Sequence, residues 1–396
     1  MADREWRGHW WLPGQDADAV PGTLVQRESD GELVLHLIGG FSIDKLVPVD
    51  EHQSAISIEP NFPMILGTCS GEPFTLLECQ ARHTSGAGFL SRAVSEQDIG
   101  VRRGLRGIHL TAPDEEVFDS AVLNVEYLLG WMQKTTFDDV RVELNEWKWT
   151  GHQTASTKPV ADITTFHDGY EYTLGVVFNQ FRFEDRPRAN ERSLANREWA
   201  ELTIKSETPT TFAGFDRASK AIMDLMTLVA HAPAGVIREK VRFTPSEQQP
   251  ARGRRTAEVE VMGRQIHQPK PGAKETARVD YLFTLEDIEF SEVLPKWLDL
   301  HERAWLACGI LFGLSYIREG YTSSRLLSAA TAAESLHRAL DPDATRIAPD
   351  RFNAIRKMVK DALAGKTAEM VEARTFVNNR GLFSWLRRSA AQLRLR

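Results

Sequence analysis

The chain has 396 residues, of which 42% are hydrophobic and 26% charged, a composition that fits a folded protein of about two to three domains and excludes a disordered chain. The formal net charge is −7, so the surface as a whole is not that of a non-specific nucleic-acid binder. Three cysteines, Cys69, Cys79 and Cys308, are too few for a disulfide framework and lack zinc-ligand spacing, which excludes a zinc module.

The N-terminal residues mix charge with tryptophan and contain no apolar segment of the kind that a signal peptide needs. The longest uncharged apolar run, Ala304 to Ile317, has 14 residues, whereas a membrane span needs about 20. We therefore expect no membrane partner, a cytoplasmic location and reduced thiols.

Two kinds of pattern divide the chain. Residues 1 to about 290 consist mainly of short strand-like runs separated by turn residues, and residues 291–396 have helical patterns. The sequence therefore predicts an α+β protein in which a β-rich, sandwich-like region of about 290 residues precedes an all-α helical bundle. We expect two domains, 1–290 and 291–396.

Two β-hairpins are predicted near the N-terminus, each with a glycine in its turn: Thr23–Arg27 with Glu32–Ile38, and Pro63–Thr68 with Phe74–Gln80. Asp30-Gly31 is the turn signal of the first hairpin. Cys69 and Cys79 flank the second, and we interpret them as buried thiols, with a redox pair as the alternative.

Residues 117–132 fit a strand and a helix equally well, and we favour a strand that ends in a helical turn. One amphipathic helix is predicted at Phe215–His231, with Asp216 as its N-terminal cap. Residues 244–277 are expected to form largely an exposed loop around one short strand. Further strands are predicted at Glu171–Phe178, Trp199–Lys205, Glu239–Phe243, Thr256–Met262 and Arg278–Leu285.

Three or four helices are predicted in the C-terminal part: Leu294–Ile317, a helix from Ser323 or Ser324 to Leu340, Phe352–Leu363 and Leu382–Leu393. Asp341-Pro342 ends the second of these helices, because a residue before proline is disfavoured in the helical conformation.

No self-sufficient catalytic motif is present: the chain lacks G-x-S-x-G, a P-loop, a G-x-G-x-x-G after a strand and H-E-x-x-H. Glu334 and His337 form a single E-x-x-H, whereas a di-iron site needs two such motifs and two further carboxylates. We therefore assign no catalytic, cofactor-binding or metal-binding residue, and no cofactor.

Basic and aromatic clusters supply the candidate contacts to nucleic acid or to a ligand. Two groups of arginines can hold phosphate if they share a surface, with a solvated charged loop as the alternative: Arg102, Arg103 and Arg106, and Arg252, Arg254, Arg255 and Arg264. Trp147 and Trp149 lie two residues apart and can stack on bases or cap a pocket, with core packing as the alternative. The chain from Lys366 onward has seven basic residues and two acidic ones, which fits an RNA-facing end or a frayed helix.

Three segments resemble a known family. The opening GHWWLPGQDADAVPGTLVQRESDGELVLHLIG and the later HLTAPDEEVFDSAVLNVEYLLGW resemble the start and the middle of the ApeA N-terminal domain. The segment LPKWLDLHERAWLACGILFGLSYIREGYTSSRLLSAATAAESLHRAL resembles the first two helices of the HEPN domain that follows it in that family.

This resemblance implies a prokaryotic anti-phage defence protein of the abortive-infection type. The β-rich part would sense an invader, and the helical part would be a metal-independent RNA-cleaving effector that forms a homodimer. RNA or a phage-derived trigger would be the partner. HEPN ribonucleases carry an Arg, usually followed by a polar residue, then four to six residues and a His. The His transfers a proton and the Arg stabilises charge on the phosphate.

The expected motif is missing. No His follows His337, and none lies within range of Arg374. We therefore expect a HEPN-like domain truncated before its motif, with no ribonuclease activity, and an apolar groove left uncovered along Leu306, Ile310, Leu311 and Leu314. The spacings Arg4–His9 and Arg102 or Arg103 to His109 are expected by chance. The alternatives are a HEPN endoribonuclease completed by a partner chain and a plain protein-interaction module.

Overall fold

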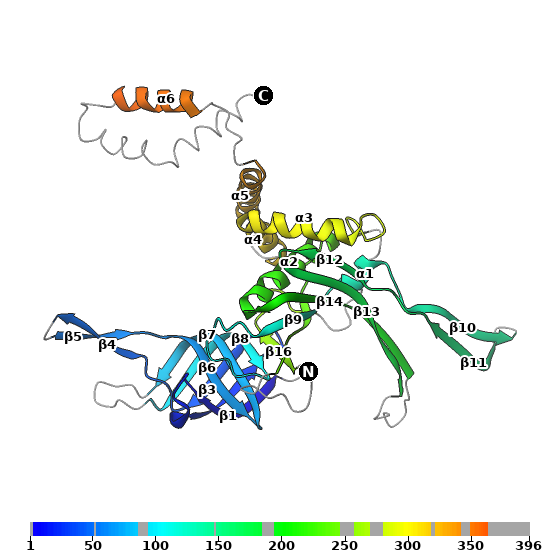
Figure 1. The fold of residues 1–396 in the computed structure, drawn as a ribbon, viewed down its shortest axis with the longest axis horizontal. Helices are drawn as coiled ribbons and strands as arrows, with labels where there is room; N and C mark the ends of the chain where they lie inside the picture. The colour runs from blue at the N-terminus through cyan, green and yellow to red at the C-terminus, as the bar shows by residue number, and fades with distance from the viewer. Residues whose placement is uncertain are drawn as a thin grey trace. The chain divides into compact units, whose positions relative to one another are not determined.

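The computed structural model describes residues 3–50, 53–85, 94–145, 148–183, 194–245, 257–269, 280–317, 321–341 and 349–362 (Figure 1). The predicted order, a β-rich region of about 290 residues followed by helices, is confirmed. The chain divides into two units, Met1–Ala332 and Ala333–Arg396. The first unit contains every described strand and the helices α1 to α4, and α5 (Thr322–Leu340) extends into the second unit, which also contains α6 (Pro349–Ala362).

A closed antiparallel barrel forms the first half of the β-rich region, because β8 pairs with both β3 and β7 and so joins the two ends of the row β8-β3-β2-β1-β6-β7. Its strands are β1 (Arg4–Trp11), β2 (Val20–Gln26), β3 (Leu33–Ile38), β6 (Asn61–Cys69), β7 (Glu72–Ser85) and β8 (Glu96–Arg106), with a short 3-10 helix at Asp16–Asp18. Both predicted hairpins are present. Ser70 and Gly71 have φ of 52° and 78°, as a tight hairpin turn requires. A separate hairpin consists of β4 (Asp44–Asp50) and β5 (Gln53–Ile58).

Apolar side chains fill the barrel. Trp10 is fully buried and meets the ring of Phe74 edge-on, with 5.9 Å between ring centroids. Gly67 is required beside it, since a Cβ at that position would lie 2.1 Å from the indole of Trp10. Cys69 and Cys79 are free, buried thiols in this core, as predicted. Burial raises the pKa of Cys69 to about 11 and raises that of Cys79 further, which disfavours reactive thiolates.

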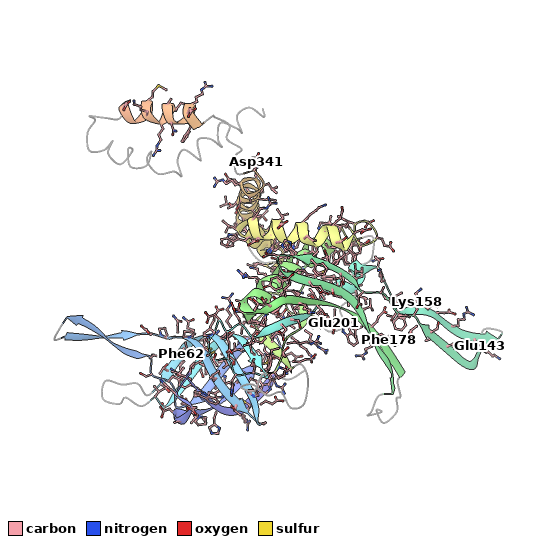
Figure 2. All side chains as sticks on the ribbon, viewed as in Figure 1. Phe62, Glu143, Lys158, Phe178, Glu201 and Asp341 are labelled. Atoms are coloured by element: carbon pink, nitrogen blue, oxygen red, sulfur yellow. The ribbon has the colours of Figure 1, made fainter. Side chains whose placement is uncertain are left out.

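An open sheet continues from the barrel through the pairing of β16 with β8, in the order β8-β16-β15-β9-β14-β13-β12. Its strands are β9 (Phe118–Val125), β12 (Ile163–His167), β13 (Tyr170–Phe183), β14 (Leu194–Thr210), β15 (Val236–Phe243) and β16 (Ala257–Gly263). The strand predictions at Glu171–Phe178, Trp199–Lys205, Glu239–Phe243 and Thr256–Met262 thus correspond to β13, β14, β15 and β16. A further hairpin consists of β10 (Phe137–Asn145) and β11 (Lys148–Thr157), and Phe137 meets Phe178 of β13 at 6.3 Å between ring centroids (Figure 2).

The ambiguous segment 117–132 contains β9 and the short helix α1 (Leu128–Met132), so the predicted strand with a helical turn is confirmed. The predicted helix over Phe215–His231 is α2 (Phe212–Ala230), which packs on the sheet through Phe212 and Phe215. The prediction that Asp216 caps this helix is wrong. The helix begins one turn earlier, after Thr211, and the carboxylate of Asp216 is bound elsewhere.

The single helix predicted for Leu294–Ile317 is two helices, α3 (Phe290–Arg303) and α4 (Trp305–Tyr316), which meet at Ala304. Tertiary contacts explain the break. In one straight helix Trp297 and Phe312 would lie about 22 Å apart along the axis, at 1.5 Å per residue. Their ring centroids are 5.9 Å apart, so the chain has to turn between them. Of the four positions on α4 expected to be uncovered, Leu306 and Leu311 are exposed, whereas Ile310 and Leu314 are half-buried.

The strand predicted for Arg278–Leu285 is wrong over its described part, because residues 280–285 form no strand. This segment instead donates backbone hydrogen bonds from Leu282 to Val229 O and from Leu285 to Trp131 O, which attach it to the ends of α2 and α1. The predicted helix Leu382–Leu393 and most of the loop over 244–277 lie outside the described residues.

Candidate functional site

A cleft of about 1210 Å³ lies where the barrel meets the open sheet; we call it the junction cleft. The barrel contributes parts of β1, β2, β7 and β8 and the turn between β2 and β3 to its lining, and the other side is lined by β9, β14, β15, β16 and α2. Eight carboxylate and eight basic side chains line it, so it presents charges of both signs rather than a basic surface.

On the barrel side of the cleft, two guanidinium groups bind one buried carboxylate. Glu32 is 8% exposed, and its two carboxylate oxygens lie 2.6 Å from Arg27 Nη1 and 2.7 Å from Arg82 Nη1. Gly100 makes this arrangement possible, because a Cβ there would lie 2.2 Å from Arg82 Nε. Glu32 is therefore neutralised from both sides, as a buried carboxylate needs to be.

The predicted arginine cluster of β8 does not act as one group. Arg102 and Arg103 line the cleft, and Arg106 is not among the lining residues. Arg102 forms an exposed ion pair with Glu78 at 2.8 Å, and Arg106 bonds Glu72 at 2.6 Å. These guanidinium groups already have carboxylate partners, and their contact with nucleic acid or a ligand stays a prediction.

Glu260 of β16 joins Arg106 to the first strand. Its Oε2 lies 3.1 Å from Arg106 Nη1, and its Oε1 lies 2.8 Å from Arg4 Nη1. Burial alone would raise the pKa of Glu260, but the hydrogen bonds and charges of Arg4 and Arg106 outweigh it and lower the pKa. This carboxylate is therefore stabilised in its charged form.

Arg103 crosses the cleft to α2. Its Nε and Nη2 donate to the same oxygen of Asp216, Oδ1, at 2.9 and 2.7 Å. Within the described part of the chain, Asp216 Oδ2 has no hydrogen-bond donor. The pair fixes α2 to β8 and leaves one carboxylate oxygen unused. His109, whose spacing from Arg103 suggested a pair, instead places Nε2 2.8 Å from Gly67 O.

Glu239 of β15 is held less completely. Its Oε1 accepts a hydrogen bond of 2.7 Å from the Ser219 hydroxyl of α2, and no described residue donates to Oε2. The pKa of Glu239 is raised to about 6, because burial, with the charge of Asp216, outweighs the lowering effects of the Ser219 hydrogen bond and of Arg103. A carboxyl group with a raised pKa in a cleft is a functional-site signal.

Unpaired charges and exposed apolar side chains lie on the same side of the cleft. Lys220 and Arg238 form no ion pair with any described residue. Ile237 and Ile266 are 59% and 65% exposed. Trp199 also lines the cleft, and its indole N–H donates to Glu201 at 2.7 Å. This side therefore offers polar and apolar contacts that the protein itself does not use.

The second arginine group and the tryptophan pair are largely outside the described residues. Arg252, Arg254, Arg255 and Trp147 are among these, and Trp149 is described only as a backbone position of β11 that pairs with Leu144. Arg264 lies in the cleft lining, with Nε 3.7 Å from Asp30. The predicted tryptophan platform remains untested.

A buried polar network that the sequence analysis missed attaches α3 and α4 to α2. Asp224, with its side chain 2% exposed, lies 2.9 Å from His301 Nε2 and accepts a 3.1 Å hydrogen bond from the Tyr316 hydroxyl. The Tyr316 hydroxyl also lies 2.9 Å from Thr227 Oγ1. Burial, with the charge of Asp224, raises the pKa of Tyr316. A carboxylate on the apolar face of the predicted helix was the available signal.

Metal-ligating residues do not gather in the described part of the chain, where no group of three or more His, Cys, Asp or Glu side chains could hold a metal ion. Glu334 of the E-x-x-H motif lies 3.5 Å from Arg338. No helix among the described residues is both long and apolar enough to span a membrane.

Comparison with protein families matches residues 5–297 to ApeA N-terminal domain 1. The chain belongs to this family. Apart from Arg4, the match contains the barrel, the open sheet, α2 and every residue that lines the junction cleft, so the cleft is a feature of the ApeA N-terminal domain in this chain. ApeA N-terminal domains are associated with anti-phage defence proteins. No curated protein and no solved structure matches the chain. The resemblance of the helical part to HEPN domains stays a prediction.

Proposed function

We propose that this chain is a sensor of the anti-phage defence type and that its ApeA N-terminal domain recognises a phage-derived trigger in the junction cleft. The observation that carries the proposal is the cleft's sheet side, where Glu239, Lys220 and Arg238 have unused bonding capacity beside the exposed Ile237. Protein surfaces that keep polar and apolar groups unsatisfied in a concave site are typical of ligand-binding sites.

RNA is the second candidate trigger, because two arginines of β8 line the cleft. The ion pair of Arg102 is exposed and therefore weak, so a phosphate can compete for this guanidinium. Arg103 is bound more tightly, through two of its nitrogens. The equal numbers of basic and acidic side chains in the lining favour a trigger other than RNA.

For the helical region we propose a HEPN-like domain without ribonuclease activity of its own, in a cytoplasmic protein that dimerises through this region and takes part in abortive infection. The support is the resemblance of residues 294–340 to HEPN helices and the absence of His after His337. Incubating the purified chain with total RNA tests the activity. We expect intact RNA, and cleavage that an Arg103→Ala or His109→Ala change abolishes would contradict the proposal.

Sensing is tested by binding. The purified full chain is exposed to lysate from phage-infected and from uninfected cells, and each species retained only from infected cells is purified and titrated again. We expect at least one phage-encoded species whose affinity falls about tenfold or more for Glu239→Gln, with Lys296→Ala of α3 as the control that retains wild-type affinity. The side chain of Lys296 is 73% exposed and lies outside the cleft.

Two outcomes contradict the sensor proposal. One is that no phage-derived species binds the wild-type chain. The other is that a phage-derived species binds and is indifferent to Glu239→Gln and to Arg103→Ala, which would place recognition outside the junction cleft. Near-ultraviolet circular dichroism of each variant establishes that it is folded.

A further inference from the structure

The carboxylates of the junction cleft differ in how many of their oxygen atoms remain available to a ligand. On the barrel side, Glu32 has a guanidinium on each oxygen. Opposite, Glu239 Oε2 and Asp216 Oδ2 have no donor among the described residues. Asp216 belongs to α2, and Glu239 is bound to Ser219, which lies one helical turn after Asp216 on the same helix, so both carboxylates line the same part of the cleft.

The charges around these acceptors do not balance. Among the described residues, Arg103 pairs with Asp216, and no cation forms an ion pair with Glu239. Asp216 of α2 and Arg103 of β8 act on Glu239 with opposite charge, Lys220 of α2 is exposed in the same cleft lining, and the partner of Glu239 on β9, Leu123, is apolar. A partly buried carboxylate without a cation has lost some of its hydration, so a cation from outside would be favoured there.

Exposed apolar side chains line the same cleft as the carboxylate of Glu239. The register of β15 with β9 shifts between Val236 and Arg238, so Ile237 is the extra residue of a β-bulge, and its side chain is 59% exposed. Bulges re-aim side chains beside functional sites. Ile266 adds a second exposed apolar side chain to the lining. Arginine and lysine side chains lie with their aliphatic stems along such surface and their charged ends on a carboxylate.

We propose that the junction cleft binds an arginine or lysine side chain of a protein trigger, with its charged end on Glu239 Oε2 and its stem along Ile237. This inference rests on the proposed sensing function and names the chemistry of its ligand. Arginine fits best, because its planar guanidinium can bridge the free oxygens of Glu239 and Asp216.

Matched peptides test this assignment on the full chain. Three labelled nine-residue Gly-Ser peptides carry three arginines, three citrullines or three glutamates, and a labelled uridine-rich RNA of similar length is the fourth probe. Fluorescence anisotropy at pH 7.5 measures their affinities. We expect the arginine peptide to bind at least tenfold more tightly than the citrulline peptide, which has nearly the same shape without the charge.

The variants identify the carboxylate responsible. Glu239→Gln should weaken the arginine peptide about tenfold and leave the citrulline peptide unchanged. Glu292→Gln, an exposed carboxylate on α3, is the matched control that keeps full affinity and corrects for general attraction to an acidic protein. Lowering the pH to 5 should also weaken the wild type about tenfold, because Glu239, with a pKa of about 6, is then mostly protonated.

Equal binding of arginine and citrulline peptides, preferential binding of the glutamate peptide or the RNA, or an unchanged affinity in Glu239→Gln would each overturn the assignment. These results leave the sensor proposal standing if the phage-derived species still loses affinity in the cleft variants. Conversely, a chain that binds the arginine peptide through Glu239 and binds no phage-derived species would support the site and contradict the sensor function.

Discussion

On the barrel side of the junction cleft, Glu32 accepts from Arg27 and Arg82, whereas on the sheet side Glu239 accepts from a single group of the described residues, the Ser219 hydroxyl. The two carboxylates belong to one cleft and differ in their neighbours. The barrel side has been completed by residues of the chain itself, which stabilises the fold. The sheet side remains incomplete, which costs stability and keeps bonding capacity for a ligand, a trade-off that proteins commonly make at functional sites.

The largest expected effect comes from removing both cations of the barrel side. An Arg27→Ala, Arg82→Ala double variant leaves Glu32 buried without a partner, and we expect the free energy of unfolding to fall by about 3–5 kcal/mol. Urea denaturation measures it. Arg102→Ala removes an equally close but exposed ion pair and serves as the control, with a change within about 0.5 kcal/mol. Equal losses would contradict the difference between buried and exposed pairs.

The next largest loss of stability is expected for a substitution on α2. Asp224 of this helix contacts α3 and α4, whereas its Asp216 and Ser219 line the cleft. Asp224→Asn keeps the shape and removes the charge that accepts from Tyr316 and pairs with His301. We expect a loss of about 1.5–3 kcal/mol in thermal or urea unfolding, because hydrogen bonds to a buried charged group are among the stronger ones. An unchanged stability would show that this network does not hold α3 and α4 in place.

Glu239→Gln should act in the opposite direction to the two preceding variants. Because the folded-state pKa is raised from 4.5 to about 6, the folded state binds the proton more tightly, and wild-type stability falls as pH rises from about 4.5 through 6. The difference is about 2 kcal/mol at most, at 1.36 kcal/mol per pKa unit. Glutamine has no such cost, so the variant should be more stable than the wild type at pH 7.

Urea titrations of the wild type and Glu239→Gln between pH 4 and 7 measure this difference. Glu292→Gln is the control, and its difference from the wild type should stay flat over the same range. A Glu239→Gln variant that is less stable than the wild type at pH 7 would show that Glu239 is a structural carboxylate rather than one left incomplete for a ligand.

Local patterns predicted the fold better than the site. The turns at Asp30-Gly31 and Ser70-Gly71 depend on positive φ, which glycine adopts without steric cost, so the hairpins around them were predictable. Closure of the barrel depends on β8 pairing with β7 and β3, and no short-range pattern encodes such long-range pairing. The break at Ala304 likewise depends on the contact of Trp297 with Phe312.

The candidate site failed to appear in the sequence for a related reason. Arg103 was chosen because it lies near two other arginines along the chain, but its partner Asp216 is 113 residues away. Glu239 lies inside a predicted strand and has no neighbouring signal at all. Its partner Ser219 belongs to a helix that was predicted from its apolar positions, and these say nothing about the role of a serine. The chemistry arises from the packing of α2 on the sheet, which brings Asp216 to Arg103 of β8 and Ser219 to Glu239 of β15, and the sequence pattern does not specify this packing.

Of the substitutions considered, Glu260→Gln should change the stability least. The direction of its change at pH 7 should be opposite to that of Glu239→Gln. Arg4 and Arg106 lower the pKa of Glu260 below the ordinary 4.5, so its contribution to stability is present above that value and is lost as pH falls through the folded-state pKa. Glu260→Gln should therefore be less stable than the wild type at pH 7, and the two should converge in acid. Its side chain is 35% exposed, so screening by solvent limits the change in stability to less than about 1 kcal/mol.

Urea titrations of Glu260→Gln and Glu239→Gln against the wild type should give difference curves of opposite sign at pH 7. If both variants shift stability in the same direction, Glu239 does not differ from the ion-paired Glu260 in the way that the ligand proposal requires.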